Sequence, residues 1–308
     1  MKSTVTLLRY EKAEPARLDK FLAESLPAYS RSLLQELIAA GKVLVDGGVC
    51  LKAALKLAAG QNVSVELPAQ EENGILAENL PLDIIYQDAN TIVINKPAGI
   101  IVHPGAGHTT GTIVNAALYR WPDIRQVGEA QRPGVVHRLD KETSGVLVLA
   151  RTQSAYEWLV RQFKSRKTEK YYLALTDGHP PTPTGRIEAA VGRDPKFRQR
   201  MAVVYEGKGR KAVSEYHTVQ NFRNHALLEV RPLTGRTHQI RVHLAYLGCP
   251  VVGDRVYGHR KASLPLGRFF LHAARLRIIL PGEKTATEFQ AVLPEDLTLA
   301  LNTLSSQE

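Results

Sequence analysis

The N-terminal part of the chain carries two helical patterns of hydrophobic residues. In residues 17–26, RLDKFLAESL, apolar side chains recur at helical spacing and charged side chains occupy the rest of the circumference. Pro27 then ends this helix, because proline lacks the backbone N–H that a helix interior needs. A second helix is predicted over residues 31–40, RSLLQELIAA, with Ser30 as its N-cap and Gly41 directly after it.

Strand patterns follow this pair of helices. Residues 42–45 and 63–67 have the apolar and β-branched residues typical of strands, and Asp46-Gly47-Gly48 is typical of a turn. We therefore predict a small α/β domain over residues 1–68, with its core in residues 15–68.

The rest of the chain, residues 82–308, is predicted to form one larger domain. Between the two domains, residues 69–81, AQEENGILAENLP, are acidic and lack a periodic apolar face, so they are interpreted as a linker. Short runs with β-branched residues predict strands over residues 84–86, 91–95, 134–136, 146–150, 171–175, 227–230 and 275–280. Helical patterns occur over residues 112–119 and 154–165. Because strands and helices do not alternate regularly, we expect an α+β fold with a mixed, mainly antiparallel β-sheet flanked by helices and loops.

Composition excludes several classes of protein. The 308 residues are 44% hydrophobic and 23% charged, as in an ordinary globular chain and unlike a disordered one. The apolar runs are too short for a membrane-spanning helix, which needs about 20 apolar residues. The N-terminus has no signal-peptide pattern. We therefore expect no membrane contact and a cytoplasmic location.

No motif for a metal or a nucleotide cofactor occurs. Cys50 and Cys249 lie far apart without CxxC or Cys/His spacing. His238 and His243 have arginines beside them, whose charge would oppose a cation. The glycine pattern that begins at Gly105 has the spacing GxGxxxG instead of the dinucleotide-binding GxGxxG, and there is no Walker A loop. Neither a metal nor a cofactor is expected.

The charge of the chain is unevenly distributed. The net charge of +10 favours a polyanionic partner such as a nucleic acid. Residues 151–241 contain eighteen Lys/Arg and eight Asp/Glu, an excess as large as that of the whole chain. The densest parts are residues 164–170 and 193–211. They indicate either a basic binding surface or a set of solvated cationic faces.

A polar loop between two apolar runs carries a candidate catalytic carboxylate. This loop, HRLDKETSG at residues 137–145, is expected to project from the ends of two strands. Asp140, flanked by Arg138 and Lys141, would stay ionised there and could act as a base or a nucleophile. Alternatively, Asp140 caps a turn or completes an ion pair.

A second polar segment is dominated by cations. Residues 231–243, RPLTGRTHQIRVH, contain three arginines and two histidines, which is unfavourable unless they meet an anion or a carboxylate. The segment is therefore either a phosphate-binding surface or the partner of a buried catalytic carboxylate. If residues 238–243 form a helical turn, Arg241 and His238 share one face.

These segments resemble two known families. Residues 17–50 are similar to the S4 RNA-binding domain. HRLDKETSG, KYYLA at residues 170–174 and GRTHQIRVH at residues 235–243 resemble, in this order, the motifs of RluA/RluD-type RNA pseudouridine synthases. Further agreement lies in residues 95–97, 101–107 and 253–258, so the resemblance spans essentially the whole chain.

The resemblance implies an isomerase that converts specific uridines in RNA to pseudouridine without a cofactor. The resemblance also implies a role for three residues of this chain. Asp140 would be the essential residue, Tyr172 would contact the target base, and Arg241 would pair with Asp140. Attack on the nucleoside and abstraction of a ribose proton both remain open for Asp140. Tyr171, on the opposite face of the strand, is the better candidate for a core tyrosine. The HPGAG stretch at residues 103–107 and the S4 domain imply large-subunit (23S) ribosomal RNA as the substrate, and a monomer is the default.

Basic residues in three regions are candidate RNA contacts. They are Arg138 and Arg236 in the two motif loops, Arg198, Arg200, Lys208, Arg210 and Lys211 in a predicted flap or hairpin, and Arg17, Lys20, Arg31 and Lys42 in the S4-like domain. Arg138 and Arg236 could instead brace the two loops, and the hairpin cations could belong to a solvated loop. His103, His137 and His238 are open between structural and functional roles.

Other functions also fit parts of the pattern. A noncatalytic RNA-binding or ribosome-assembly factor would use the S4-like domain and the basic surface, and would tolerate exchange of Asp140. A glycoside or nucleoside hydrolase would need a second carboxylate as general acid, and only Glu142 lies nearby in sequence. A pseudouridine synthase acting on transfer RNA is a further alternative.

Overall fold

The computed structural model describes residues 3–26, 29, 31–68, 74–105, 107–197, 200–205 and 207–306. The predictions for Pro27, Ser30, Arg198 and the first part of the linker, residues 69–73, lie outside the described residues. The chain divides into two compact units, Met1–Gly74 and Ile75–Glu308. Each unit has a hydrophobic core of its own.

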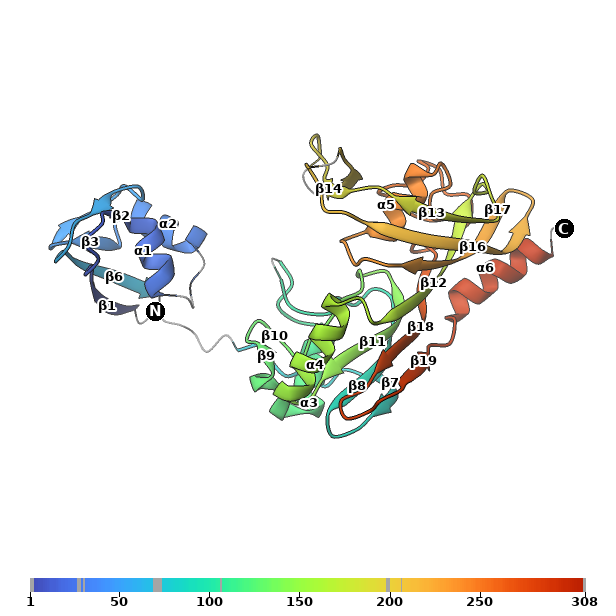
Figure 1. The fold of residues 1–308 in the computed structure, drawn as a ribbon, viewed down its shortest axis with the longest axis horizontal. Helices are drawn as coiled ribbons and strands as arrows, with labels where there is room; N and C mark the ends of the chain where they lie inside the picture. The colour runs from blue at the N-terminus through green and yellow to red at the C-terminus, as the bar shows by residue number, and fades with distance from the viewer. Residues whose placement is uncertain are drawn as a thin grey trace. The chain divides into compact units, whose positions relative to one another are not determined.

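The N-terminal unit combines a small antiparallel sheet with two helices (Figure 1). The sheet has the order β1 (Ser3–Arg9), β6 (Asn62–Pro68), β3 (Val43–Val45) and β4 (Gly48–Val49), and β2 (Ala16–Arg17) pairs with β5 (Lys56–Leu57). Helices α1 (Leu18–Ser25) and α2 (Arg31–Ala39) bury their apolar faces in one cluster with Val43, Val63 and Val65. The predicted helices are therefore confirmed to within one residue at each end.

The turn predicted at residues 46–48 is also present. Asp46 and Gly47 join β3 to β4 and have φ angles of 49° and 81°. Two successive residues with positive φ form the tight turn that matches the twist of a hairpin, and Asp-Gly favours it. The Asp46 carboxylate accepts hydrogen bonds from Asn62 N (2.8 Å) and Gln61 Nε2 (2.8 Å), which tie the turn to β6.

The larger unit is built on a nine-stranded sheet, counted over the described residues (Figure 1). The strands are β7 (Asp83–Gln87), β8 (Thr91–Lys96), β11 (Ser144–Ala150), β12 (Glu169–Asp177), β13 (Thr184–Glu188), β16 (Val213–Phe222), β17 (His225–Pro232), β18 (Leu271–Ile279) and β19 (Ala286–Gln290). Their order is β13-β16-β17-β12-β18-β11-β8-β7, and β19 also pairs with β18. Among these strands only β11 and β18 pair in parallel. The prediction of a mixed, mainly antiparallel sheet is confirmed.

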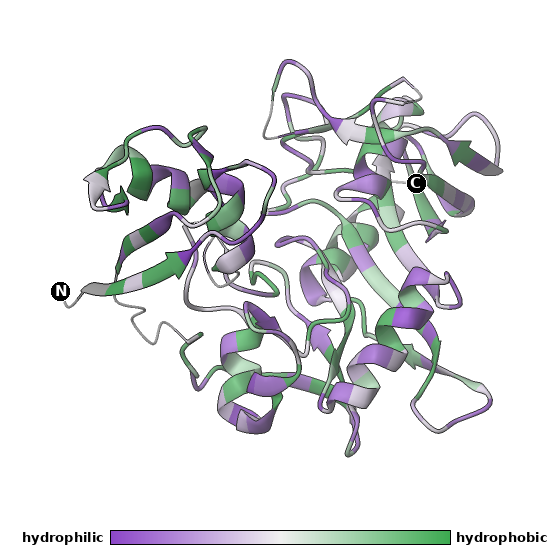
Figure 2. Cartoon of the chain, turned by 60° about the vertical axis from the view of Figure 1, so that its left-hand side comes forward, coloured by the Kyte–Doolittle hydropathy of each residue, from purple (hydrophilic) through white to green (hydrophobic). Residues whose placement is uncertain are grey.

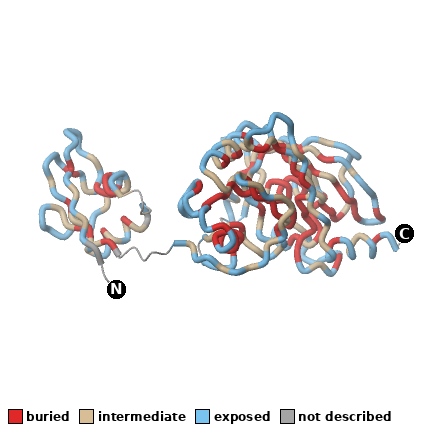
Figure 3. Tube along the Cα trace, turned by 90° about the horizontal axis from the view of Figure 1, so that it is seen from below, coloured by how far each residue is buried: buried red, intermediate tan, exposed pale blue. Residues whose placement is uncertain are grey.

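Two hydrophobic cores divide this sheet between them. The first joins β8 and β11 to α3 (Ile113–Arg120) and α4 (Gln153–Lys164), and the second joins β12 and β17 to α5 (Gln239–Tyr246) and α6 (Glu295–Ser305). The helices carry both hydrophilic and hydrophobic residues (Figure 2). Buried residues concentrate in the interior of this unit, and exposed ones follow its loops (Figure 3). Tyr172 packs against both cores.

Smaller elements complete the larger unit. They are the 3₁₀ helix η1 (Pro122–Gln126), the short pair β9 (Gly128–Glu129) and β10 (Arg132–Pro133), and the hairpin β14 (Val191–Arg193) and β15 (Met201–Val203). No helix in the described part of the chain is both long and apolar enough to cross a membrane.

The structure corrects one predicted strand. Residues 134–136 form no strand, and Val135 makes only an isolated bridge with Leu149. Gly134 has a φ of 71°, so the backbone turns there instead of extending. The apolar run was therefore a buried loop rather than a strand.

The second half of the predicted linker belongs to the larger unit. Leu76 O accepts a hydrogen bond from Asn115 Nδ2 (2.7 Å), and Ile75 O accepts one from Arg125 Nη2 (3.0 Å). The Glu78 carboxylate accepts the N–H of Gly111 at 3.1 Å. Residues 75–81 are thus held to the body that follows them.

Candidate active site

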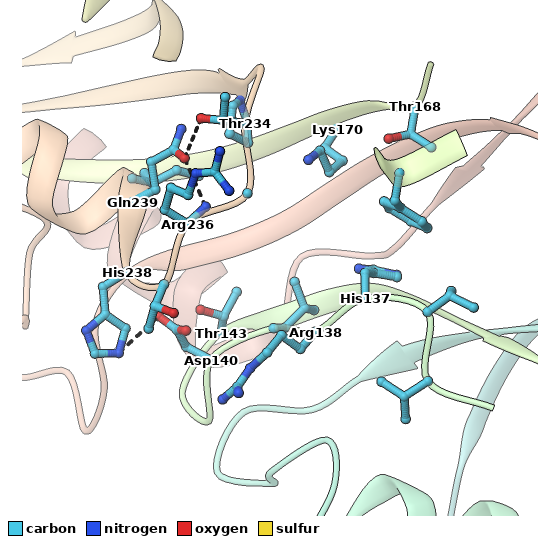
Figure 4. A pocket seen from close by; sticks show the side chains of 18 of the residues that line it. His137, Arg138, Asp140, Thr143, Thr168, Lys170, Thr234, Arg236, His238 and Gln239 are labelled. Carbon is cyan, nitrogen blue, oxygen red and sulfur yellow. Dashed lines mark hydrogen bonds and ion pairs between the residues drawn. The ribbon is translucent and has the colours of Figure 1, made fainter. Parts of the chain in front are cut away.

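A cavity of about 580 Å³ is lined by side chains from both cores of the larger unit. Leu139 reaches it from the first core, Ile240 from the second, and Tyr172 from the strand between them. Asp140 and Arg241 lie on its polar wall. Figure 4 shows Asp140 on the loop that faces the segment carrying Arg236 and His238.

Asp140 is held through one of its two carboxylate oxygens. Oδ2 lies 3.2 Å from Arg241 Nη1 and 3.8 Å from His238 Nε2. Oδ1 has no partner among the described residues, and the side chain is 21% exposed. Asp140 therefore presents one fixed and one free oxygen at the cavity.

A buried lysine is hydrogen-bonded to the backbone of the loop that carries Asp140. Lys96 is fully buried, and its Nζ donates to the carbonyl oxygens of Pro97 (2.7 Å), Ile100 (2.8 Å) and Lys141 (3.1 Å). The N–H of Gly99 also donates to Lys141 O at 2.9 Å. Burial lowers the pKa of Lys96 to about 8. The Asn-Lys-Pro motif thus fixes the backbone next to Asp140.

The second residue of the strand after this loop is a glycine that no other residue could replace without movement. Gly145 has a φ of 118°, and a Cβ built there would lie 2.2 Å from Ala273 O. Ala273 is its partner in the parallel pairing of β11 and β18. The close approach of these two strands sets where the Asp140 loop ends.

Arg241 is shared between two carboxylates. Its Nε and Nη2 donate to Asp254 at 2.6 Å and 3.0 Å, while Nη1 points to Asp140. Asp254 is buried and also accepts the backbone N–H groups of Val256 (2.9 Å) and Tyr257 (3.1 Å). Although burial opposes it, the hydrogen bonds from Arg241 lower the pKa of Asp254. Asp254 therefore anchors the guanidinium that faces Asp140.

His238 stands at the start of α5 in an unusual backbone conformation. Its φ and ψ are 56° and 17°, the left-handed region that few side chains other than Asn, Asp and His adopt. Nδ1 lies 2.8 Å from Tyr257 Oη, and Nε2 faces Asp140 (Figure 4). Burial lowers the pKa of His238. The imidazole is therefore fixed between a tyrosine and the candidate catalytic carboxylate.

Gln239 shapes the loop before α5. Its Oε1 accepts hydrogen bonds from Thr234 Oγ1 (2.6 Å) and Arg236 N (3.0 Å), as Figure 4 shows. Its Nε2 donates to Val213 O and Ser214 Oγ, both at 2.9 Å. Gln239 is buried, so these bonds tie the cationic segment firmly to β16.

The two tyrosines of β12 have opposite surroundings. Tyr172 lines the cavity, where burial and the charge of Asp140 raise its pKa. Tyr171 lies under the guanidinium groups of Arg231 (5.8 Å from the ring centroid) and Arg275 (4.4 Å), and its hydroxyl donates to Glu169. Tyr171 is half-buried among charged groups, so its prediction as a core residue is wrong.

Six cations besides Arg241 line the cavity around Asp140 and Tyr172. They are Arg132, Arg138, Lys164, Arg166, Lys170 and Arg236. Arg132 is paired with Glu129 at 2.6 Å, whereas Lys170 has no hydrogen-bond or ion-pair partner among the described residues. Burial lowers the pKa of Lys170 to about 8. The cavity lining therefore has the charge that an RNA backbone would need.

The predicted flap is the hairpin β14–β15 and the chain that follows it. Arg200, Lys208, Arg210 and Lys211 are exposed on it. Arg200 lies 5.0 Å from the ring centroid of Phe197, which is 57% exposed, and Tyr205 is 87% exposed. Arg236 Nε donates to Lys211 O at 3.2 Å, which joins this segment to the cavity wall.

The cations proposed for the N-terminal unit are partly engaged by carboxylates. Arg17 (3.0 Å) and Arg31 (2.7 Å) converge on Asp19, whose side chain is fully buried. Lys42 pairs with Glu66 at 2.7 Å, and Lys20 is exposed. Asp19 therefore holds the two arginines side by side on the surface of the N-terminal unit.

The other candidate histidines differ from His238. His137 Nε2 accepts the N–H of Val148 at 3.0 Å, and its ring stacks on Phe163 at the edge of the cavity. Burial lowers the pKa of His137 to about 3. His103 lines the cavity. In the described part of the chain, no group of three His, Cys, Asp or Glu side chains could hold a metal ion.

These features together suit an enzyme that acts on a polyanion: a carboxylate and an arginine face a cavity that is also lined by cations. A family model described as "RNA pseudouridylate synthase" matches residues 90–246, and the model of the S4 domain matches residues 16–63. The chain belongs to the RNA pseudouridylate synthase family, so it is an isomerase. The sequence prediction of the family and of the enzyme class is confirmed.

Relatives match along most of their length. An uncharacterized RNA pseudouridine synthase of Chloroflexus aurantiacus is 48% identical over 291 residues, which are 94% of this chain and 90% of the relative. The ribosomal large subunit pseudouridine synthase D of Escherichia coli is 41% identical over 293 residues, 91% of this chain and 88% of the relative. Among solved structures, the human RNA pseudouridylate synthase domain containing 4 is similar with a TM-score of 0.58 and 28% identity, covering 72% of this chain and 93% of that one.

Proposed function

We propose that the protein converts specific uridines of large-subunit ribosomal RNA to pseudouridine, with Asp140 as the catalytic residue. The observation that carries this proposal is the free Oδ1 of Asp140 at a basic cavity, with Oδ2 fixed by Arg241. The similarity to the Escherichia coli enzyme, whose name specifies the large ribosomal subunit, supports the substrate. A ribosomal substrate would place the reaction in the bacterial cytoplasm, and we take the acting form to be a monomer.

The reaction exchanges one bond for another within the nucleotide. The N1–C1′ bond breaks, the uracil rotates, and a C5–C1′ bond forms, while C5 loses a proton and N1 gains one. Atoms and electrons balance without an oxidant or reductant, so we propose that no cofactor is used. Asp140 either attacks the nucleoside or removes a ribose proton, and its free Oδ1 could serve both. Arg241 orients the carboxylate in either case.

The target uridine must leave the RNA stack to reach Asp140. A flipped base could enter the cavity of about 580 Å³ and stack on Tyr172, since a base–aromatic contact contributes about 1–3 kcal/mol. The cations that line the cavity would hold the flanking phosphates. Among the predicted RNA contacts these include Arg138, which is exposed, and Arg236.

Two further surfaces are proposed to contact the RNA. On the hairpin segment, Arg200, Lys208, Arg210 and Lys211 alternate with the exposed aromatic rings of Phe197 and Tyr205, an arrangement that suits stacking and phosphate contacts. In the N-terminal unit, Arg17, Arg31, Lys20 and Lys42 would contact structured RNA.

The experiment that tests the proposal is a pseudouridine map of ribosomal and transfer RNA. Cells whose sole copy is wild type are compared with cells carrying Asp140→Asn, which is nearly isosteric. Loss of particular large-subunit sites in the variant would support activity, substrate and catalytic residue together. Loss of transfer RNA sites alone would show that the substrate is transfer RNA and not ribosomal RNA. Identical maps would refute the catalytic role of Asp140 and favour the assembly-factor alternative.

A further inference from the structure

A tyrosine outside the three motif loops connects the hairpin to the candidate catalytic site. The N–H of Met201, in β15, donates to Tyr257 Oη at 2.9 Å, and the same oxygen lies 2.8 Å from His238 Nδ1. Met201 and Tyr257 also pack in one small cluster with Val242 of α5. Tyr257 thus links Met201 to His238 by hydrogen bonds, and the far nitrogen of His238 faces Asp140 at 3.8 Å.

The donor and the acceptor of each of these hydrogen bonds are assigned from the protons that the groups carry. A backbone N–H can only donate, so the Met201 bond occupies an acceptor position of the hydroxyl. Burial raises the pKa of Tyr257, so the hydroxyl keeps its proton at neutral pH. The hydroxyl therefore has one proton to donate, and His238 Nδ1, at 2.8 Å, is the acceptor that faces it. A neutral imidazole that accepts at Nδ1 carries its own hydrogen on Nε2.

The backbone holds the imidazole in this orientation. His238 adopts the left-handed conformation at a φ of 56°, and its ring meets that of Tyr257 edge-on at a centroid distance of 5.7 Å. Its Nε2 then faces Asp140 Oδ2 at 3.8 Å. A left-handed non-glycine residue in such a place is strained and persists only when its surroundings hold it.

We propose that Tyr257 is a positioning residue that keeps His238 neutral with its Nε2–H facing Asp140, leaving the negative charge of Asp140 available for the reaction. This inference rests on the proposed role of Asp140. Without the Tyr257 hydroxyl, Nδ1 would be free to take a proton. The resulting imidazolium would then form an ion pair with Asp140 and compete with its chemistry.

All charged groups around His238 bear on this equilibrium. Asp140 and Asp254 favour the imidazolium, whereas Arg241 on the same helix and Arg138 on the Asp140 loop oppose it. Burial lowers the pKa of His238 below its ordinary value, so the wild-type ring is neutral at physiological pH. Removal of the Tyr257 hydroxyl takes away a bond made only to the neutral ring, so the pKa of His238 rises.

The test combines two readouts on the full-length protein. Nitrogen-15 NMR of histidine-labelled wild type and Tyr257→Phe reports the tautomer and titration of His238, with His238→Gln identifying its signal. We expect the Nε2–H tautomer in wild type and, in Tyr257→Phe, a titration midpoint higher by about one pH unit, since one net hydrogen bond corresponds to about that shift. An Nδ1–H tautomer in wild type would overturn the inference, whatever the activity.

The second readout is the rate of uridine isomerisation on unmodified large-subunit ribosomal RNA transcribed in vitro. Tyr257→Phe should lower kcat about tenfold below the ordinary histidine pKa of about 6.5 and little above it, with KM unchanged. In His238→Gln, adding Tyr257→Phe should have no further pH-dependent effect, because the imidazole through which Tyr257 acts is absent. Tyr246→Phe, at an exposed position of the same helix, is the matched control.

The possible outcomes separate the two proposals. A pH-independent loss of activity in Tyr257→Phe, or an unchanged profile, would overturn the positioning role even if the tautomer is as expected. If wild type and Asp140→Asn are equally inactive on every RNA tried, the proposed function fails. The NMR result would then still decide the state of His238.

Discussion

Arg241 Nη1 lies 3.2 Å from Asp140 Oδ2 although the two residues are 101 positions apart in the sequence. Arg241 is 5% exposed and Asp140 21%, so the guanidinium forms the floor of the cavity and the carboxylate its accessible surface. The other side of the guanidinium is occupied by the fully buried Asp254. One arginine therefore has two tasks: it neutralises a buried carboxylate and orients an accessible one.

These two tasks can be separated by mutation. Arg241→Met should destabilise the protein by about 3–5 kcal/mol, because it leaves the buried charge of Asp254 without its partner. Adding Asp254→Asn should restore most of that stability, since an amide oxygen can still accept from Val256 N and Tyr257 N. Activity should stay absent, because Asp140 remains unpaired. Urea unfolding and uridine conversion measure the two effects, and recovery of activity in the double variant would contradict the second task.

Arg241→Lys tests whether the geometry of the guanidinium matters in addition to its charge. Lysine keeps the charge but cannot donate two bonds to Asp254 and a third to Asp140 from a rigid fork. We expect a smaller loss of stability than with methionine and a large loss of kcat. Full activity in Arg241→Lys would mean that charge alone is required.

Gly145 provides a test of how the Asp140 loop is fixed. Gly145→Ala combines an unfavourable φ with a contact of 2.2 Å to Ala273 O, and each effect costs about 1–3 kcal/mol. The strands must separate at the first residues of β11, so kcat should fall together with stability. Gly267→Ala is the control, because its Cβ would meet nothing within 4 Å and its φ lies outside the left-handed region. Equal stability of the two variants in urea unfolding would contradict the close approach of β11 and β18.

The elements best predicted from the sequence are those whose stability is local. α1, α2 and α4 show a clear apolar stripe and begin and end near recognisable signals, so their bounds were predicted to within about one residue. β13, β16 and β19 were not predicted, because their side chains alternate weakly and their pairing depends on strands distant in the sequence. α5 was left conditional, since six of its eight residues are buried and no polar stripe marks a helix.

The candidate site likewise contains residues that the sequence could identify and residues whose roles only the fold shows. Asp140, Tyr172 and Arg241 stand in motifs whose resemblance to a family could be recognised. Asp254 and Tyr257 lie in GDRVYG, which also showed that resemblance, but their roles depend on contacts with Arg241, His238 and Met201 that only the fold creates. Lys170 was visible as a motif residue, and only the structure shows that it faces the cavity without a partner.

The pairing of Asp19 with two arginines predicts a pH-dependent N-terminal unit. Hydrogen bonds from Arg17, and then those from Arg31 and Gln35, hold the pKa of Asp19 well below its usual range against the effect of burial. The stabilisation is therefore present above the unfolded pKa of about 3.9 and is lost as the pH falls towards the lower folded pKa. Asp19→Asn should remove this dependence and destabilise α1 and α2 at neutral pH.

Hydrogen exchange of α1 and α2 in the full-length chain measures the effect of Asp19→Asn. RNA affinity should fall several-fold at the same time, because Arg17 and Arg31 lose their common anchor. Glu24→Gln is the control, since its exposed pair with Lys12 should contribute little. Unchanged exchange in Asp19→Asn would contradict the prediction.

The lowered pKa of Lys170 predicts a loss of RNA binding in alkaline solution. Its pKa of about 8 lies below the ordinary 10.5, so the amine is charged below about pH 8 and neutral above it. If the charge holds a phosphate at the cavity, kcat/KM should decline as the pH rises through 8, because that ratio reports the free enzyme. Lys170→Arg, which stays charged, should flatten the decline, and Lys170→Met should lower kcat/KM several-fold at neutral pH. Lys284→Met, at an exposed position outside the cavity, is the control. A decline that persists in Lys170→Arg would assign the alkaline titration to another group.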